Sequence, residues 1–143
     1  MTLWIEYLGQ YLGSSTAGIG VWAATSTAPK TIYLNNLPGS TASLIMLYPY
    51  AGTAPDWTMD EASIRHPRLN IAVYSTSSDG GYQKSIDIRT RLDHAHGLSY
   101  PTSTTPTINF SLIKALGEPE YLGKDEIGRG YCVTNYEIEY STN

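Results

Sequence analysis

The chain has 143 residues, which is the size of one domain with a single hydrophobic core. Its formal net charge is −4, so most of its surface would repel the phosphate backbone of nucleic acid, and DNA binding by charge is excluded. A single cysteine, Cys132, excludes an internal disulfide, and no stretch reaches the roughly twenty apolar residues of a membrane span. We therefore expect a soluble protein that is made in the cytoplasm.

The first half of the chain predicts one helix followed by strands. Residues 2–12 carry an apolar stripe at helical spacing, which predicts an amphipathic helix that ends at Gly13, with Gly9 on the side opposite the stripe. Short apolar runs predict strands at 17–24 and 31–34. The run at 42–48 is almost continuously apolar, which is typical of a central strand that is covered on both faces.

From Pro49 to Arg65 the composition predicts a long irregular loop. Such loops are usually functional or become ordered on a partner. Trp57 could anchor a partner there or fold back onto the sheet, and the sequence leaves both readings open.

The second half predicts a strand, a helix and a closing hairpin. Alternation predicts a strand over 68–74, and a weaker helical period predicts a helix over 80–96, with Tyr82, Ile86, Arg89 and Leu92 on one side. A strand over 107–114 then leads into a turn at 119–129, where Asp125 and two glycines favour reversal. The last strand, 130–140, places Cys132, Thr134, Tyr136, Ile138 and Tyr140 on one face, which we expect to be buried.

No pattern in the chain identifies catalytic, metal-binding or cofactor-binding residues. His94 and His96 lie two apart on a predicted helix, whereas helical metal ligands normally lie three or four apart. The carboxylates around the closing turn lack the alternate-position spacing of a calcium loop. The Asp125/Arg129 pair is best explained as part of the turn, with contact to a neighbouring subunit as the alternative. We therefore expect a protein that is not an enzyme.

Together these elements predict a single α+β domain over residues 1–143, with two helices and five or six strands in a mainly antiparallel sheet. The helices are predicted to flank this sheet. The closing hairpin, residues 107–140, is the element around which the rest is arranged.

The closing block carries a proline, the string Leu-Gly-x-Asp-x-x-Gly-Arg at 122–129, and an alternating last strand that contains Asn135-Tyr136. In these features it resembles the tail terminator proteins of long-tailed bacteriophages. Upstream of this block, an opening helix, a strand at 67–73 and a helix at 82–96 occur in the same order as in that family.

The resemblance implies a structural virion protein located at the tail and neck and assembled in the host cytoplasm. Such a protein forms a hexameric ring on the tail tube, stops tube growth and joins the head–tail connector. The resemblance also implies the tube protein and the connector proteins as partners. It implies that DNA passes through the lumen without sequence-specific binding, and it implies neither a cofactor nor contact with a membrane. The residues that we expect at subunit interfaces are Trp57, Met59, Asp60, Glu61, Glu118, Glu120, Lys124, Asp125, Glu126 and Arg129.

Two alternatives remain open at this stage. One is another neck or head-completion protein of the head–tail joint. The other is a small binding module that recognises a ligand through Trp22, Trp57 and exposed tyrosines.

Overall fold

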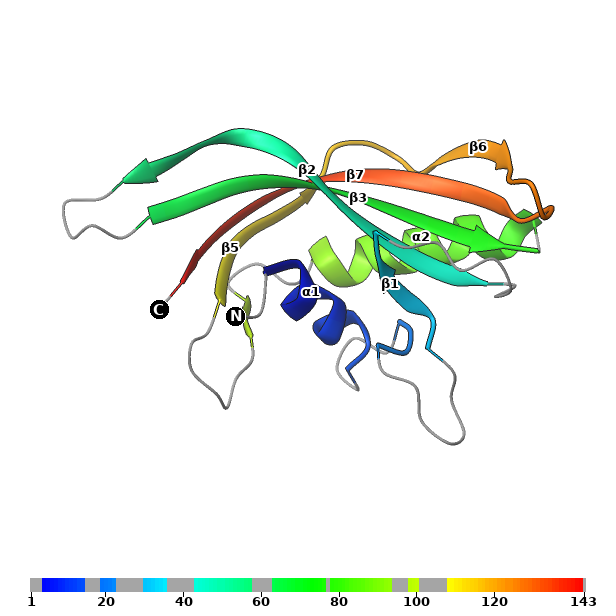
Figure 1. Ribbon diagram of the computed structural model, residues 1–143, viewed down its shortest axis with the longest axis horizontal. Helices are drawn as coiled ribbons and strands as arrows, with labels where there is room; N and C mark the ends of the chain where they lie inside the picture. The colour runs from blue at the N-terminus through cyan, green and yellow to red at the C-terminus, as the bar shows by residue number, and fades with distance from the viewer. Residues whose placement is uncertain are drawn as a thin grey trace.

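A computed structural model describes residues 4–14, 19–22, 30–35, 43–57, 63–76, 78–93, 98–100 and 108–142. Figure 1 shows a curved sheet with two helices packed beneath it. The helices are α1 (Trp4–Leu12) and α2 (Ser78–Asp93). The strands are β1 (Ile32–Leu34), β2 (Leu44–Trp57), β3 (Ser63–Ser75), β4 (Leu98–Tyr100), β5 (Ile108–Ala115), β6 (Glu120–Lys124) and β7 (Gly130–Thr142).

The sheet has seven strands in the order β1-β2-β3-β7-β5-β4, and β6 also pairs with β7. Only the β1–β2 pair is parallel among the described strands, and the other pairs are antiparallel. The predicted α+β class with a mainly antiparallel sheet is therefore confirmed. The expected number of strands was too low because β6 lies inside the segment predicted as a turn and β4 lies between the predicted helix and the next predicted strand.

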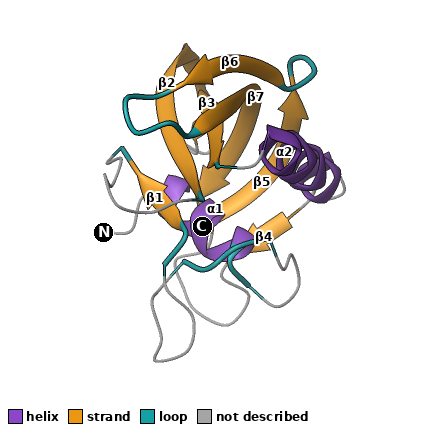
Figure 2. Cartoon of the chain, turned by 90° about the vertical axis from the view of Figure 1, so that its right-hand side faces the viewer, coloured by secondary structure: helices purple, strands orange, loops and turns teal. Residues whose placement is uncertain are grey.

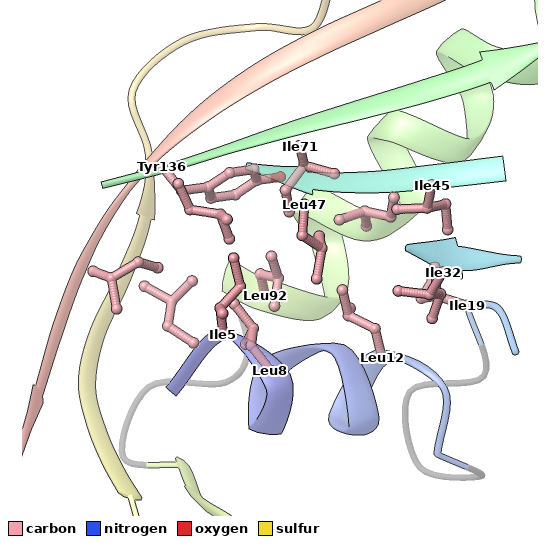
Figure 3. Close-up of a cluster of buried hydrophobic side chains, with 14 of the residues drawn as sticks. Ile5, Leu8, Leu12, Ile19, Ile32, Ile45, Leu47, Ile71, Leu92 and Tyr136 are labelled. Atoms are coloured by element: carbon pink, nitrogen blue, oxygen red, sulfur yellow. The ribbon is translucent and has the colours of Figure 1, made fainter. Parts of the chain in front are cut away.

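The core lies between one face of the sheet and both helices. α1 contributes Ile5, Leu8 and Leu12, and α2 contributes Ile88 and Leu92. Figure 2 shows the sheet curving around the helices, and Figure 3 shows side chains from α1 and α2 meeting those of β2, β3 and β7. Tyr136 and Ile138 of β7 are fully buried there, so the predicted inner face of the last strand is confirmed.

The predicted apolar side of the second helix was wrong except at Leu92, which is buried. Among the residues of α2 whose burial is described, Gly81, Ser85, Ile88 and Leu92 are buried, whereas Tyr82 is 44% exposed. Ser85 can face the core because its hydroxyl donates a hydrogen bond to the carbonyl oxygen of Gly81, at 2.9 Å. His94 and His96 lie outside the described residues.

The predicted position of Gly9 on the outer side of the first helix was also wrong. Gly9 is buried, and a Cβ placed on it would overlap Cζ3 of Trp22. The indole ring of Trp22 therefore packs directly on the helix backbone at this position. Trp22 belongs to the segment expected to form the first strand, but its described part, residues 19–22, is not a strand.

The segment predicted as a long loop is mostly a β-hairpin arm. β2 continues to Trp57, and its end pairs with the start of β3 through Asp56↔Ile64 and Trp57↔Ser63. Pro49 is tolerated because β1 pairs with β2 only as far as Leu47, and no other described strand pairs with the outer edge of β2 beyond that residue. Two register shifts, at Tyr50/Thr53 and Thr53/Asp56, interrupt this arm.

The other face of the sheet carries a second, smaller cluster. Leu44, Met46, Ala72 and Tyr74 are buried there, and Tyr33, Tyr48, Tyr131 and Val133 pack against them. The tyrosine rings thus cover apolar side chains on the face opposite the helices. This placement explains much of the tyrosine content of the chain.

Candidate assembly surface

The candidate surface is the two-stranded unit formed by β6, the turn at residues 125–129 and the start of β7. β6 pairs with β7 from Glu120↔Val133 to Lys124↔Gly130, with a register shift between Tyr121 and Gly123. Gly123 has a φ of 114°, a conformation that L side chains rarely adopt. β6 is therefore a short strand that a bulge interrupts.

The carboxylate of Asp125 organises the turn. Its Oδ1 accepts hydrogen bonds from the backbone N–H of Ile127 at 3.2 Å and of Arg129 at 2.8 Å. Its Oδ2 accepts one from Nε of Arg129 at 2.7 Å. The backbone N–H of Asp125 in turn donates to the carbonyl oxygen of Arg129, at 2.8 Å. A single side chain therefore fixes both ends of the reversal.

The pKa of Asp125 reflects these bonds. Burial raises the pKa of this carboxyl, but the hydrogen bonds and charge of Arg129, with the backbone N–H of Ile127, outweigh it. The net result is a pKa below the ordinary value for aspartate. The turn is consequently stabilised by an ionised carboxylate.

Arg129 connects the turn to the body of the sheet. It is only 2% exposed, and its guanidinium lies 5.3 Å from the ring centroid of Tyr74. Tyr74 stacks on Tyr131, with ring centroids 5.1 Å apart. Since Arg129 is buried within its own protomer, it supports the turn from below and is not part of its outer surface.

Several apolar side chains project from this unit. The exposed fraction is 54% for Ile127, 51% for Tyr121, 48% for Leu122 and 46% for Leu116. They lie close together in the sequence, on one hairpin and its lead-in, and exposed apolar groups of this kind are candidates for contact with another protein. They were not among the predicted interface residues of the closing block, all of which are charged. The apolar character of Tyr121, Leu122 and Ile127 within a polar turn was the available signal.

The structure brings together the predicted interface residues of the closing block. Glu120, Lys124 and Glu126 are exposed on the hairpin. Glu118 precedes the hairpin and forms an ion pair with Arg89 of α2, with 2.6 Å between Oε2 of Glu118 and Nη1 of Arg89. This ion pair fixes the segment that leads into β6. Trp57 lies at the end of β2, in the hairpin arm, and Met59, Asp60 and Glu61 lie outside the described residues.

The described part of the chain offers little reactive chemistry. Within it, no three His, Cys, Asp or Glu side chains are grouped as a metal site would require. Cys132 is 1% exposed, and burial raises the pKa of its thiol, which keeps it protonated. None of the described helices has the length and apolar character needed to cross a membrane.

Comparison with known proteins gives a family match over most of the chain. The model of a family described as "Bacteriophage tail terminator protein" matches residues 15–142. A second similarity, 27% identity over 134 residues, is to a 5-methyltetrahydropteroyltriglutamate–homocysteine methyltransferase of Photorhabdus laumondii subsp. laumondii. That alignment covers 93% of this chain, and the chain spans only 18% of the length of the methyltransferase.

Proposed function

Because the chain belongs to the bacteriophage tail terminator family, which makes it a structural protein of the phage tail, we propose that its copies form a hexameric ring on the tail tube. This ring stops the polymerisation of the tube and joins the tail to the connector of the head. The family also implies contact with tail and head components. The tube protein and the connector proteins are the partners that we propose, and the protein is assembled into the virion in the host cytoplasm.

The observation that best supports this function is the preorganised closing hairpin. Its turn is held by the Asp125 carboxylate and by the buried Arg129, while Ile127, Tyr121 and Leu122 remain about half exposed. An isolated domain gains nothing from exposing these side chains at a rigid position. Contact with another protein would remove their apolar surface from water at little conformational cost.

The net charge of −4 is consistent with a ring through which DNA passes. Carboxylates near a lumen would repel phosphates, so the DNA could slide without being retained. In this proposal the protein catalyses no reaction, and its contribution to the virion is geometric. The similarity to the methyltransferase does not alter this, since it involves less than a fifth of that enzyme.

The test is to polymerise purified tube protein with and without this chain and to measure tube lengths by electron microscopy. We expect shorter tubes that carry a ring at one end, with six copies by native mass spectrometry. An Ile127→Asp variant is the matched control, because the exposed position of Ile127 should leave the fold intact. Tubes of unchanged length with the wild-type chain would show that termination is the wrong function. Rings that bound only the connector would instead favour another neck protein.

A further inference from the structure

A cavity at one end of the sheet offers a receptor for the exposed hairpin. It has a volume of about 430 Å³ and is lined mainly by apolar side chains from the segment before β1, from the start of β2 and from the end of β3. These include Val21, Leu44, Ile45 and Val73. Such a space is large enough for one or two aliphatic or aromatic side chains. Figure 3 shows Ile19, Ile32 and Ile45 grouped in this region of the core.

The cavity also carries a positive charge. Lys84 of α2 lines it and donates from Nζ to the carbonyl oxygen of Ile19, at 3.1 Å. Among the side chains that the structure describes, none provides Lys84 with a carboxylate partner. The lysine therefore keeps an uncompensated charge at a mainly apolar opening, which favours an occupant that combines an apolar group with a carboxylate.

The tip of the closing hairpin has this combination. Ile127 is 54% exposed, and its neighbour Glu126 is an exposed carboxylate. Asp125 is already engaged by Arg129, so Glu126 is the free acidic group beside Ile127. Ile127 does not line the cavity of its own chain. Only a second copy can therefore bring it into such a cavity.

The positions of the tip and the cavity suit a ring. The pairs Leu44↔Tyr74 and Ser75↔Gly130 place the start of β2, the end of β3 and the start of β7 at the same end of the sheet. In a ring whose axis runs along the strands, this end of every copy lies at the same height, so the tip of one copy can meet the cavity of the next. Such head-to-tail contacts form a ring when the rotation from copy to copy closes.

We propose that Ile127 of one copy enters the cavity beside Lys84 of the next copy, with Glu126 paired to that lysine. This inference rests on the proposed ring and specifies the surfaces that form it. Backbone pairing between edge strands contributes less, because Pro119 and the bulge at Gly123 flank and interrupt β6. The contact is made by side chains.

A charge exchange tests the pair. Glu126→Lys and Lys84→Glu should each weaken ring assembly on tubes by about tenfold, because each change places like charges together. The double variant should recover to within about threefold of the wild type. Glu120→Lys makes the same change at an exposed position of the same hairpin and should assemble normally. Assembly is measured as the concentration of the chain that gives half-maximal shortening of tubes.

Cross-linking provides a second readout that does not depend on tubes. Ser43 is exposed and lines the cavity, so a chain carrying both Ser43→Cys and Ile127→Cys should form a ladder of disulfide-linked copies under mild oxidation. Either cysteine alone should yield no such ladder.

Normal assembly of both charge variants, or no recovery in the double variant, would overturn the proposed pair while termination stands. Absence of tube shortening by the wild-type chain would overturn termination itself. In that case the cross-linked ladder still decides the contact, and its absence would overturn the contact.

Discussion

The phenol of Tyr136 gives a stability prediction that runs against the usual effect of core substitutions. Tyr136 is fully buried, and its hydroxyl has no hydrogen-bond partner among the described residues. Burial raises the pKa of this phenol far above its ordinary value, and the charge of Asp93 adds to the effect. The hydroxyl is therefore neutral at all physiological pH values. Its removal in Tyr136→Phe should stabilise the protein.

The size of this effect follows from two opposing contributions. A buried hydroxyl without a partner costs about 1–3 kcal/mol of desolvation free energy, which the substitution recovers. Removal of one oxygen leaves a void of roughly 20 Å³, which costs about 0.5 kcal/mol. The free energy of unfolding should thus rise by about 0.5–2.5 kcal/mol. For a chain of this length each 1 kcal/mol corresponds to an increase of roughly 2–4 °C in Tm.

Urea denaturation of the wild type and Tyr136→Phe measures the difference directly. Tyr121→Phe is the control, since it removes the same atom from a ring that is 51% exposed and should change the free energy of unfolding by less than about 0.5 kcal/mol. Thr134→Val tests the same reasoning at the other buried hydroxyl without a described partner. A loss of about 1 kcal/mol in Tyr136→Phe would refute it, because the hydroxyl would then be bonded in the folded protein.

Three further predictions concern the turn and the first helix. Gly128 has a φ of 88°, so Gly128→Ala should lower the free energy of unfolding, measured by urea titration, by about 1–2 kcal/mol. Gly117→Ala is the control, because no atom lies within 4 Å of the added Cβ, and it should have a much smaller effect. Since the pKa of Asp125 is lowered by folding, its contribution to stability is present above the unfolded value of about 4 and is lost as the pH falls through the lower folded value. The difference in urea midpoint between wild type and Asp125→Asn should therefore be constant above about pH 5 and shrink below about pH 4. Gly9→Ala should destabilise the protein, because the added methyl group would overlap the ring of Trp22. This overlap costs about 1–3 kcal/mol and exceeds the gain in helix propensity of about 1 kcal/mol. Trp22→Leu in the same chain should remove most of this loss in thermal denaturation.

The sequence predicted the parts of the fold in which each residue carries its own periodic signal. In β7 every second residue from Cys132 to Tyr140 is apolar or small, and the structure buries that face. The failures occurred where small or polar residues pack internally. Gly81 and Ser85 form part of the buried face of α2, because glycine allows close approach and the serine hydroxyl is bonded within the helix. A pattern based on large apolar residues cannot detect this.

The arm formed by β2 and β3 was missed for a different reason. Pro49 and the polar residues after it usually indicate a loop, but here they lie where β2 has no partner strand on its outer edge. Whether an edge is free is decided by the order of strands in the sheet, which is a property of the whole fold. β6 was missed similarly, because its pairing with β7 tolerates the bulge at Gly123.

The exposed position of Ile127 depends on residues that lie beneath it. Asp125 holds the backbone of the turn, Arg129 rests on Tyr74, and Tyr74 stacks on Tyr131, so that Ile127 is displayed from a chain of contacts that reaches into the sheet. A flexible loop presenting the same isoleucine would lose conformational entropy on every contact between copies, at about 1–2 kcal/mol for each residue ordered. In a ring this loss would recur at each interface. In the proposed ring, ordering the turn during folding would remove that loss from assembly, which gives the buried Arg129 a role in the contact although its side chain is not exposed.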